Sequence, residues 1–95
     1  MADAESLTEA TTQEQVQHLP PFKVVLHNDD VNSFEHVILT ILKLTPLSEP
    51  EAIVKTFEAH ETGQAVLLVT SKERAELYVE QFATFHLTVT CEPDD

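Results

Sequence analysis

Asn28, Asp29 and Asp30 stand where a run of apolar residues ends, and His60 stands near the end of a later helix pattern. A free α-ammonium group carries a positive charge and several N–H donors, so a protein that recognises it needs converging acceptors and a nearby anion. An Asn amide oxygen, an Asp carboxylate and a neutral His nitrogen would supply them, if packing brings these positions together. The same residues also fit a plainer interpretation, a solvated Asx turn and a histidine that only balances a helix dipole.

Two elements must place the acidic pair. Phe22–Leu26 is apolar and β-branched, which predicts a strand of a half-buried sheet. Downstream, Asn32 and Glu35 have the spacing of a capping box, which predicts the start of a helix. Pro46 disfavours helical geometry just before it, so this helix should end near Leu44. Its buried stripe is expected to hold Phe34, Val37, Ile38, Ile41 and Leu42.

The remaining elements follow from local signals. Ser48 opens a second capping box, and Gly63 is the expected end of that helix. Gln64–Thr70 is a short continuous apolar run, which predicts a central strand. Ser71 can cap a third helix, and Leu87–Cys91 alternates as an edge or half-buried strand does. The order β-α-α-β-α-β predicts an α+β domain, in which a three-stranded antiparallel sheet packs on three helices.

Composition limits the size of the fold and the classes of partner. Ninety-five residues suffice for one modest core. The net charge of −12 comes with no basic cluster, which argues against nucleic acid and anionic membranes, because both are bound through Lys and Arg. Residues 1–21 are acidic, polar and without Lys or Arg, so we expect a disordered N-terminal extension before a folded domain at residues 22–95.

Other signals bear on the compartment. Cys91 is the single cysteine, which excludes an internal disulfide and a thiolate metal cluster and favours a reducing compartment. The sequence shows neither a signal-peptide pattern nor a long apolar run. We therefore expect a cytoplasmic monomer with no cofactor and no metal.

Three marks, in order, resemble a known family. Val24–Asp30 resembles the signature of the ClpS family, the helix end Glu58–Gly63 is similar to a second family mark, and Leu87–Pro93 is similar to its closing strand. ClpS proteins are adaptors that hand N-degron substrates to the Clp AAA+ unfoldase and its protease. The resemblance covers about residues 22–93 and implies the same α+β fold. It also implies that residues 1–21 take part in delivery and that the partner is an unfoldase of the ClpA or ClpC type.

The resemblance also implies roles for individual residues. The α-amino group of a substrate would be held by Asn28, Asp29, Asp30 and His60. An adjoining pocket for its large hydrophobic first side chain would be lined by Leu26, Asn32, Phe34, Thr56, Ala59 and Leu87. Glu73 and Tyr78 occupy positions of the unfoldase-docking face.

The sequence departs from the family pattern inside these sites. Asn32-Ser33-Phe34 stands where most members have Thr-Pro-Met, Thr56 replaces a frequent methionine, and Tyr78 a frequent lysine. Methionine adapts to several shapes and a Phe/Thr pair does not, so we expect a narrower choice of first residue than the Leu, Phe, Tyr and Trp of the family.

Three other interpretations remain open on the residues alone. Asp29 and Asp30 could act as acid and base with His60 in support, but adjacent residues of one turn rarely converge on one reacting atom, and no nucleophile motif accompanies them. A metal site could be formed by His27, Asp29, Asp30 and His60, but their spacing matches no recognised ligand pattern. A protein-interaction module of similar fold without an amine site, like the C-terminal domain of the ribosomal stalk protein, is the remaining alternative.

Overall fold

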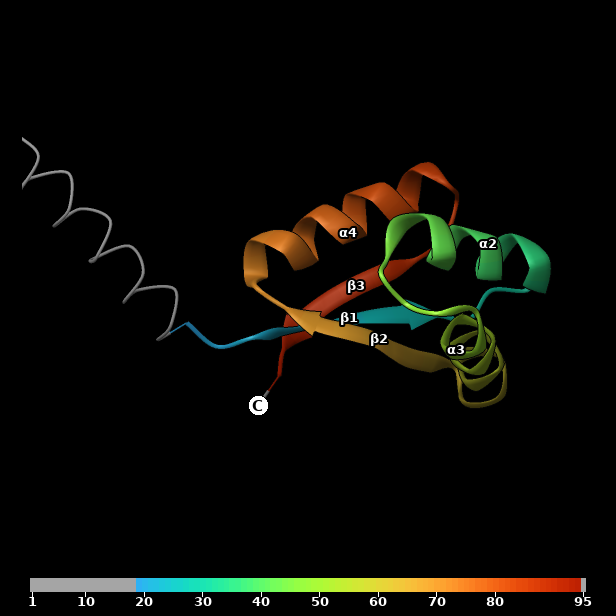
Figure 1. Cartoon of the computed structure of the whole chain (residues 1–95), viewed down its shortest axis with the longest axis horizontal. Coiled ribbons are helices and arrows are strands. Elements are labelled where there is room, and N and C mark those ends of the chain that lie inside the picture. Colours follow the sequence, from blue (N-terminus) through green and yellow to red (C-terminus); the bar gives the residue numbers. More distant parts are fainter. Residues whose placement is uncertain (1–18, 95) are drawn as a thin grey trace, which may run out of the picture.

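The structure is a computed structural model that describes residues 19–94. The elements, shown in Figure 1, are β1 (Phe22–His27), α2 (Phe34–Leu44), α3 (Glu49–Thr62), β2 (Gln64–Thr70), α4 (Lys72–Thr84) and β3 (Val89–Pro93). This order confirms the predicted α+β class. The predicted disordered extension, residues 1–21, lies almost entirely outside the described residues.

The sheet is antiparallel and has the order β2-β1-β3. The prediction that Gln64–Thr70 is the central strand is therefore wrong, because β1 lies in the centre and β2 at an edge. A bulge explains the misleading apolar run. Val24 pairs with Leu68 and Val25 with Val66, so Leu67 is an extra residue. The bulge lets two consecutive leucines contribute to the core, where a regular strand would turn the second one outward.

The core forms on one face of the sheet. Val24 and Leu26 of β1 contribute to it together with buried residues of every other element, and the largest fully buried side chains are Val24, Ile41 and Phe82. Figure 1 shows α4 running above β1 and β3, while α3 lies beside the end of the sheet. The carboxyl end of β1 and the carboxyl end of α3 therefore reach the same edge of the domain.

The helix starts confirm two caps and correct one. Ser48 and Glu51 form the predicted capping box, and Ser71 caps α4. The predicted capping box of Asn32 and Glu35 is wrong, because Ser33 is the N-cap of α2 and accepts a hydrogen bond from His36 N at 3.1 Å. The Asn32 side chain instead donates to Asp29 Oδ2 within the same loop and to the distant His86 carbonyl.

The link between α4 and β3 also differs from the expectation. β3 begins at Val89, so Leu87 precedes the strand in which it was predicted to lie. His86 has a φ of 65°, in the left-handed region, and the Leu87 backbone N–H donates to the Phe82 carbonyl at 3.1 Å. This tight turn holds Leu87 against the core before the strand starts. None of the helices within residues 19–94 has the length and apolar character that crossing a membrane requires.

Candidate functional site

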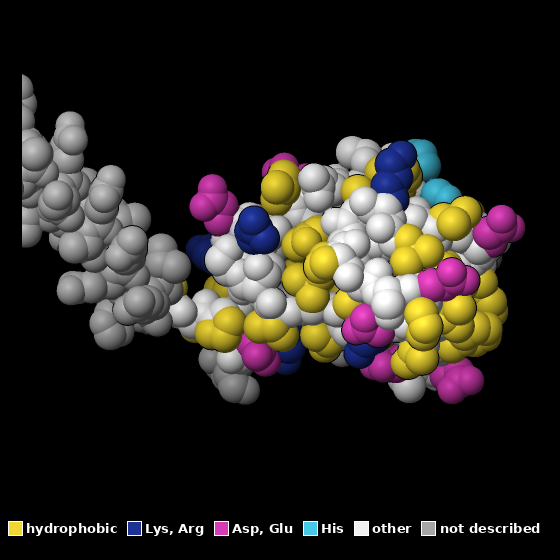
Figure 2. All heavy atoms as spheres, in the orientation of Figure 1, with side chains coloured by type: hydrophobic (Ala, Val, Ile, Leu, Met, Phe, Trp, Pro, Cys, Tyr) yellow, Lys and Arg dark blue, Asp and Glu magenta, His cyan; other side chains and the backbone are white. Residues whose placement is uncertain are grey.

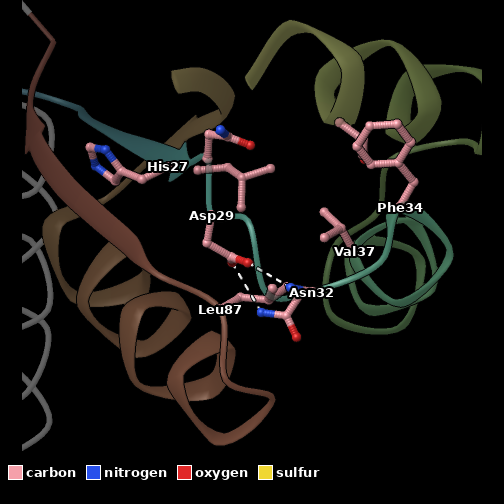
Figure 3. A pocket seen from close by; sticks show the side chains of 9 residues that line it. His27, Asp29, Asn32, Phe34, Val37 and Leu87 are labelled. Atoms are coloured by element: carbon pink, nitrogen blue, oxygen red, sulfur yellow. Dashed lines mark hydrogen bonds between the residues drawn. The ribbon is translucent and has the colours of Figure 1, made fainter. Parts of the chain in front are cut away.

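A pocket lies where β1 ends, between α2, α3 and the link before β3 (Figure 3). It holds about 300 Å³ of space including the open solvent at its mouth, but only about 20 Å³ of this admits the centre of a water molecule. The pocket is lined by Leu26, His27, Asn28, Asp29, Asn32, Phe34, Val37, Thr56 and Leu87. Buried apolar side chains form its base, and amide and carboxylate groups stand at one side.

Two backbone hydrogen bonds place the end of β1. The His27 N–H donates to the Thr88 carbonyl and the Asn28 N–H to the Gly63 carbonyl, each at 3.0 Å. Gly63 has a φ of 97°, which a residue with a side chain adopts only with strain. The glycine that ends α3 therefore also turns the chain so that its carbonyl meets β1.

Asp29 organises the loop that follows β1. Its Oδ1 accepts from Val31 N at 3.0 Å and from Asn32 N at 2.7 Å, and its Oδ2 accepts from Asn32 Nδ2 at 3.0 Å. Asn32 Nδ2 also donates to the His86 carbonyl at 2.9 Å. The Asn32 side-chain oxygen takes part in none of the hydrogen bonds found within residues 19–94, so it remains an acceptor beside the pocket.

The same contacts set the charge of Asp29. Burial alone would raise the pKa of the Asp29 carboxyl, but the hydrogen bonds from Asn32 and Val31, together with the nearby His36 imidazole, lower this pKa below its ordinary value. Asp29 is therefore an anion at neutral pH, at one wall of the pocket.

The predicted site residues divide into two groups. Asn28 and Asp29 line the pocket, as do Leu26, Asn32, Phe34, Thr56 and Leu87 of the predicted side-chain pocket. Asp30, Ala59 and His60 are not among the lining residues. Asp30 is exposed, and Ala59 is buried in the core. His60 is exposed, and its ring packs edge-to-face against Phe34, with the ring centroids 4.9 Å apart.

Two lining residues were not predicted. Val37 lies one helical turn after Phe34, so the shared stripe of α2 was a signal that could have identified it. His27 lines the pocket, but its Nε2 lies 2.7 Å from Thr90 Oγ1 in a hydrogen bond to β3. Figure 3 shows the His27 ring directed away from Phe34. No sequence signal pointed to this residue as part of the pocket wall.

The positions predicted for docking both lie on α4. Glu73 is exposed in the first turn of this helix, whereas Tyr78 is half-buried and packs against the core. Within residues 19–94, no three His, Cys, Asp or Glu side chains are grouped so as to hold an ion.

Comparison with known proteins identifies the family. Residues 17–90 match the family model of ClpS, the ATP-dependent Clp protease adaptor protein. The ClpS adapter of a Synechococcus species is 44% identical over 77 residues, which cover 80% of this chain and 74% of the relative. The ClpS adapter of Gloeobacter violaceus is 40% identical over 90 residues, which cover 92% of this chain and 97% of the relative.

A solved structure agrees with both. Agrobacterium tumefaciens ClpS2 bound to L-phenylalaninamide is 30% identical, with a TM-score of 0.71 over 79% of this chain and 98% of that one. The chain belongs to the ClpS family. It is an adaptor of the ATP-dependent Clp protease and not an enzyme, which removes the acid-base alternative.

The hydrogen bonds of Asp29 lead to a prediction about stability. Asp29→Ala should lower the free energy of unfolding by about 1–2 kcal/mol at pH 7, because it removes an ionised acceptor of three hydrogen bonds. Since folding lowers the pKa of Asp29, this contribution is present above the ordinary carboxyl pKa and is lost as the pH falls through the folded pKa. Urea denaturation should show a constant difference from about pH 5 to 8 that shrinks toward about pH 3.

Asp30→Ala is the matched control for this measurement. Asp30 is the exposed neighbour and makes none of the side-chain hydrogen bonds found in the described part of the chain, so its removal should change stability by no more than about 0.5 kcal/mol. Equal losses in the two variants would show that Asp29 does not hold the loop.

Proposed function

We propose that this protein binds the free α-amino group and the large hydrophobic first residue of N-degron substrates in the pocket at the end of β1, and delivers them to a Clp AAA+ unfoldase. One observation carries the proposal. An anionic, amide-bearing wall adjoins an apolar base within a single pocket. L-Phenylalaninamide, the ligand in the structure of the related ClpS2, combines a free amine with an aromatic side chain, which supports the same pairing here.

The amine would be held by acceptors on one side of the pocket. An ammonium group donates three hydrogen bonds, and the side-chain oxygens of Asn28, Asp29 and Asn32 all belong to residues at the pocket. The Asp29 anion supplies the opposite charge. Each charge-assisted hydrogen bond contributes about 1.5–3 kcal/mol, so two or three of them, less the cost of ordering the peptide, give about micromolar affinity.

His60 and Asp30 also remain proposed amine contacts, but they differ from the others in that neither lines the pocket. Both are exposed and stand beside the pocket residues in sequence or space, His60 through its contact with Phe34. A neutral His60 nitrogen would accept from the ammonium if the imidazole turned toward the mouth of the pocket.

The first side chain would enter between the buried residues at the base of the pocket. Leu26, Thr56 and Leu87 are each no more than 3% exposed. The Thr56 hydroxyl already donates to the Ala52 carbonyl at 2.8 Å, so it presents no free donor to the pocket. Burial of a Leu or Phe side chain there contributes about 1.5–3 kcal/mol.

Peptides that differ only at the amine test this proposal. A peptide with Leu or Phe as its first residue should bind at micromolar concentration, and the N-acetylated form should bind at least about tenfold more weakly, because acetylation removes the charge and donors of the amine. Isothermal titration or fluorescence polarisation with the full chain measures both. Equal binding of the free and acetylated peptides would exclude recognition of the α-amine.

Delivery is a separate part of the proposal and has its own test. If the α4 face around Glu73 docks on the unfoldase, Glu73→Lys should leave peptide affinity unchanged and slow degradation of a substrate by reconstituted Clp unfoldase and protease by about 2- to 10-fold. Glu49→Lys is the matched control, because both glutamates lie in the first turn of a helix and both changes carry the same helix-dipole cost. Equal rates with the two variants would remove Glu73 from the docking face.

A further inference from the structure

The enclosed part of the pocket is small. Only about 20 Å³ of its space admits the centre of a water molecule, and much of the remaining space, about 300 Å³ in total, opens to solvent. For a Leu or Phe side chain to be enclosed there, at least one wall must move when a substrate enters.

Among the apolar residues of the lining, one is held less firmly than the others. Leu26, Val37, Thr56 and Leu87 are between 2% and 9% exposed and belong to the packed interior. Asp29 and Asn32 are fixed by the hydrogen bonds of their loop. Phe34 is 39% exposed, and Figure 3 shows it on the far side of the pocket from Asp29. Phe34 is therefore the lining residue whose side chain can change its rotamer and widen the pocket.

Two rings of α3 hold Phe34 in its present position. The Phe57 ring meets it edge-to-face at 4.9 Å between centroids with 63° between the ring planes, and the His60 ring at 4.9 Å and 74°. Phe57 is itself 42% exposed and is not a residue of the pocket lining. Figure 2 shows hydrophobic side chains gathered over the α3 end of the molecule, where Phe57 and Val54 are the exposed large hydrophobic residues of that helix.

We propose that Phe57 determines which first residues the pocket admits, because it holds the Phe34 ring as a movable wall. This inference rests on the proposed function. A first residue that is unbranched at Cβ, such as Leu or Phe, needs only a small displacement of Phe34. Ile or Val places a second Cβ substituent at the mouth of the pocket and must push the Phe34 ring away from Phe57. Loss of the contact between Phe34 and Phe57 on peptide entry therefore weakens the binding of Ile and Val more than that of Leu and Phe. Phe57 acts as a positioning residue through Phe34.

Peptides that differ only at residue one test the role of Phe57. The wild-type protein should prefer Leu and Phe to Ile and Val, and Phe57→Ala should reduce this preference about 2- to 10-fold, mainly by strengthening the binding of Ile and Val. Phe57→Tyr keeps the ring and should retain the wild-type preference. Val54→Ala removes an exposed side chain one turn earlier on α3 and should also retain it.

A second measurement separates positioning from general damage to the fold. The three-bond couplings that report the Phe34 χ1 angle should indicate a single rotamer in the wild-type protein and in Val54→Ala, and rotamer averaging in Phe57→Ala. A merely structural effect would weaken all peptides alike and leave their ratios unchanged. Unchanged ratios, or an unchanged Phe34 rotamer, would overturn the role of Phe57.

The two proposals fail in distinguishable ways. Each peptide is also measured in its N-acetylated form, with the wild-type protein and with Phe57→Ala. Loss of the difference between free and acetylated peptides in the wild-type protein would contradict amine recognition itself. If free and acetylated peptides still differ but Phe57→Ala keeps the wild-type preference for Leu and Phe over Ile and Val, only the role of Phe57 is contradicted.

Discussion

The hydrogen bond from the Asn28 N–H to the Gly63 carbonyl, 3.0 Å long, joins the end of β1 to the end of α3 across a sequence separation that no local signal bridges. Because this hydrogen bond joins two backbone groups, it fixes the position from which the loop after β1 continues, whatever side chains that loop carries. Gly63 allows it by adopting a left-handed φ. One edge of the domain therefore holds both the acidic loop that follows β1 and the last part of α3, which carries Thr56, Phe57 and His60. The pocket forms at this junction.

The two sides of the pocket have different physical characters. On one side, Asp29 and Asn32 satisfy each other and the loop backbone, which makes a rigid wall with a fixed negative charge. On the other side, Phe34 contacts α3 through aromatic edges that have no hydrogen-bond directionality. A rigid polar wall suits the proposed recognition of a group common to all substrates, the α-amine. A movable apolar wall suits discrimination among first side chains, in which substrates differ.

Local signals predicted the helix ends at Ser48, Gly63 and Ser71, since each depends on a hydrogen bond or a backbone angle within a few residues. Asn32 was misassigned because Asn and Ser are both good caps, and only the tertiary bond from Asn32 to the His86 carbonyl decides between neighbouring positions. The central position of β1 was hidden by the bulge in β2, and Leu87 by the turn at His86. The contact of His60 with Phe34, which leaves the imidazole outside the lining, depends on packing between helices and has no sequence signature.

In the proposed function, the edge where β1 and α3 meet binds an amine together with its side chain. Titration of the ¹⁵N-labelled protein with L-phenylalaninamide, compared with N-acetyl-L-phenylalaninamide, tests it most directly. We expect the unblocked compound to shift the backbone amide signals of Asn28, Asp29, Asn32 and Leu87, while those of α4 stay in place and the acetylated compound has little effect. Shifts centred on α4, or equal shifts with both compounds, would contradict it.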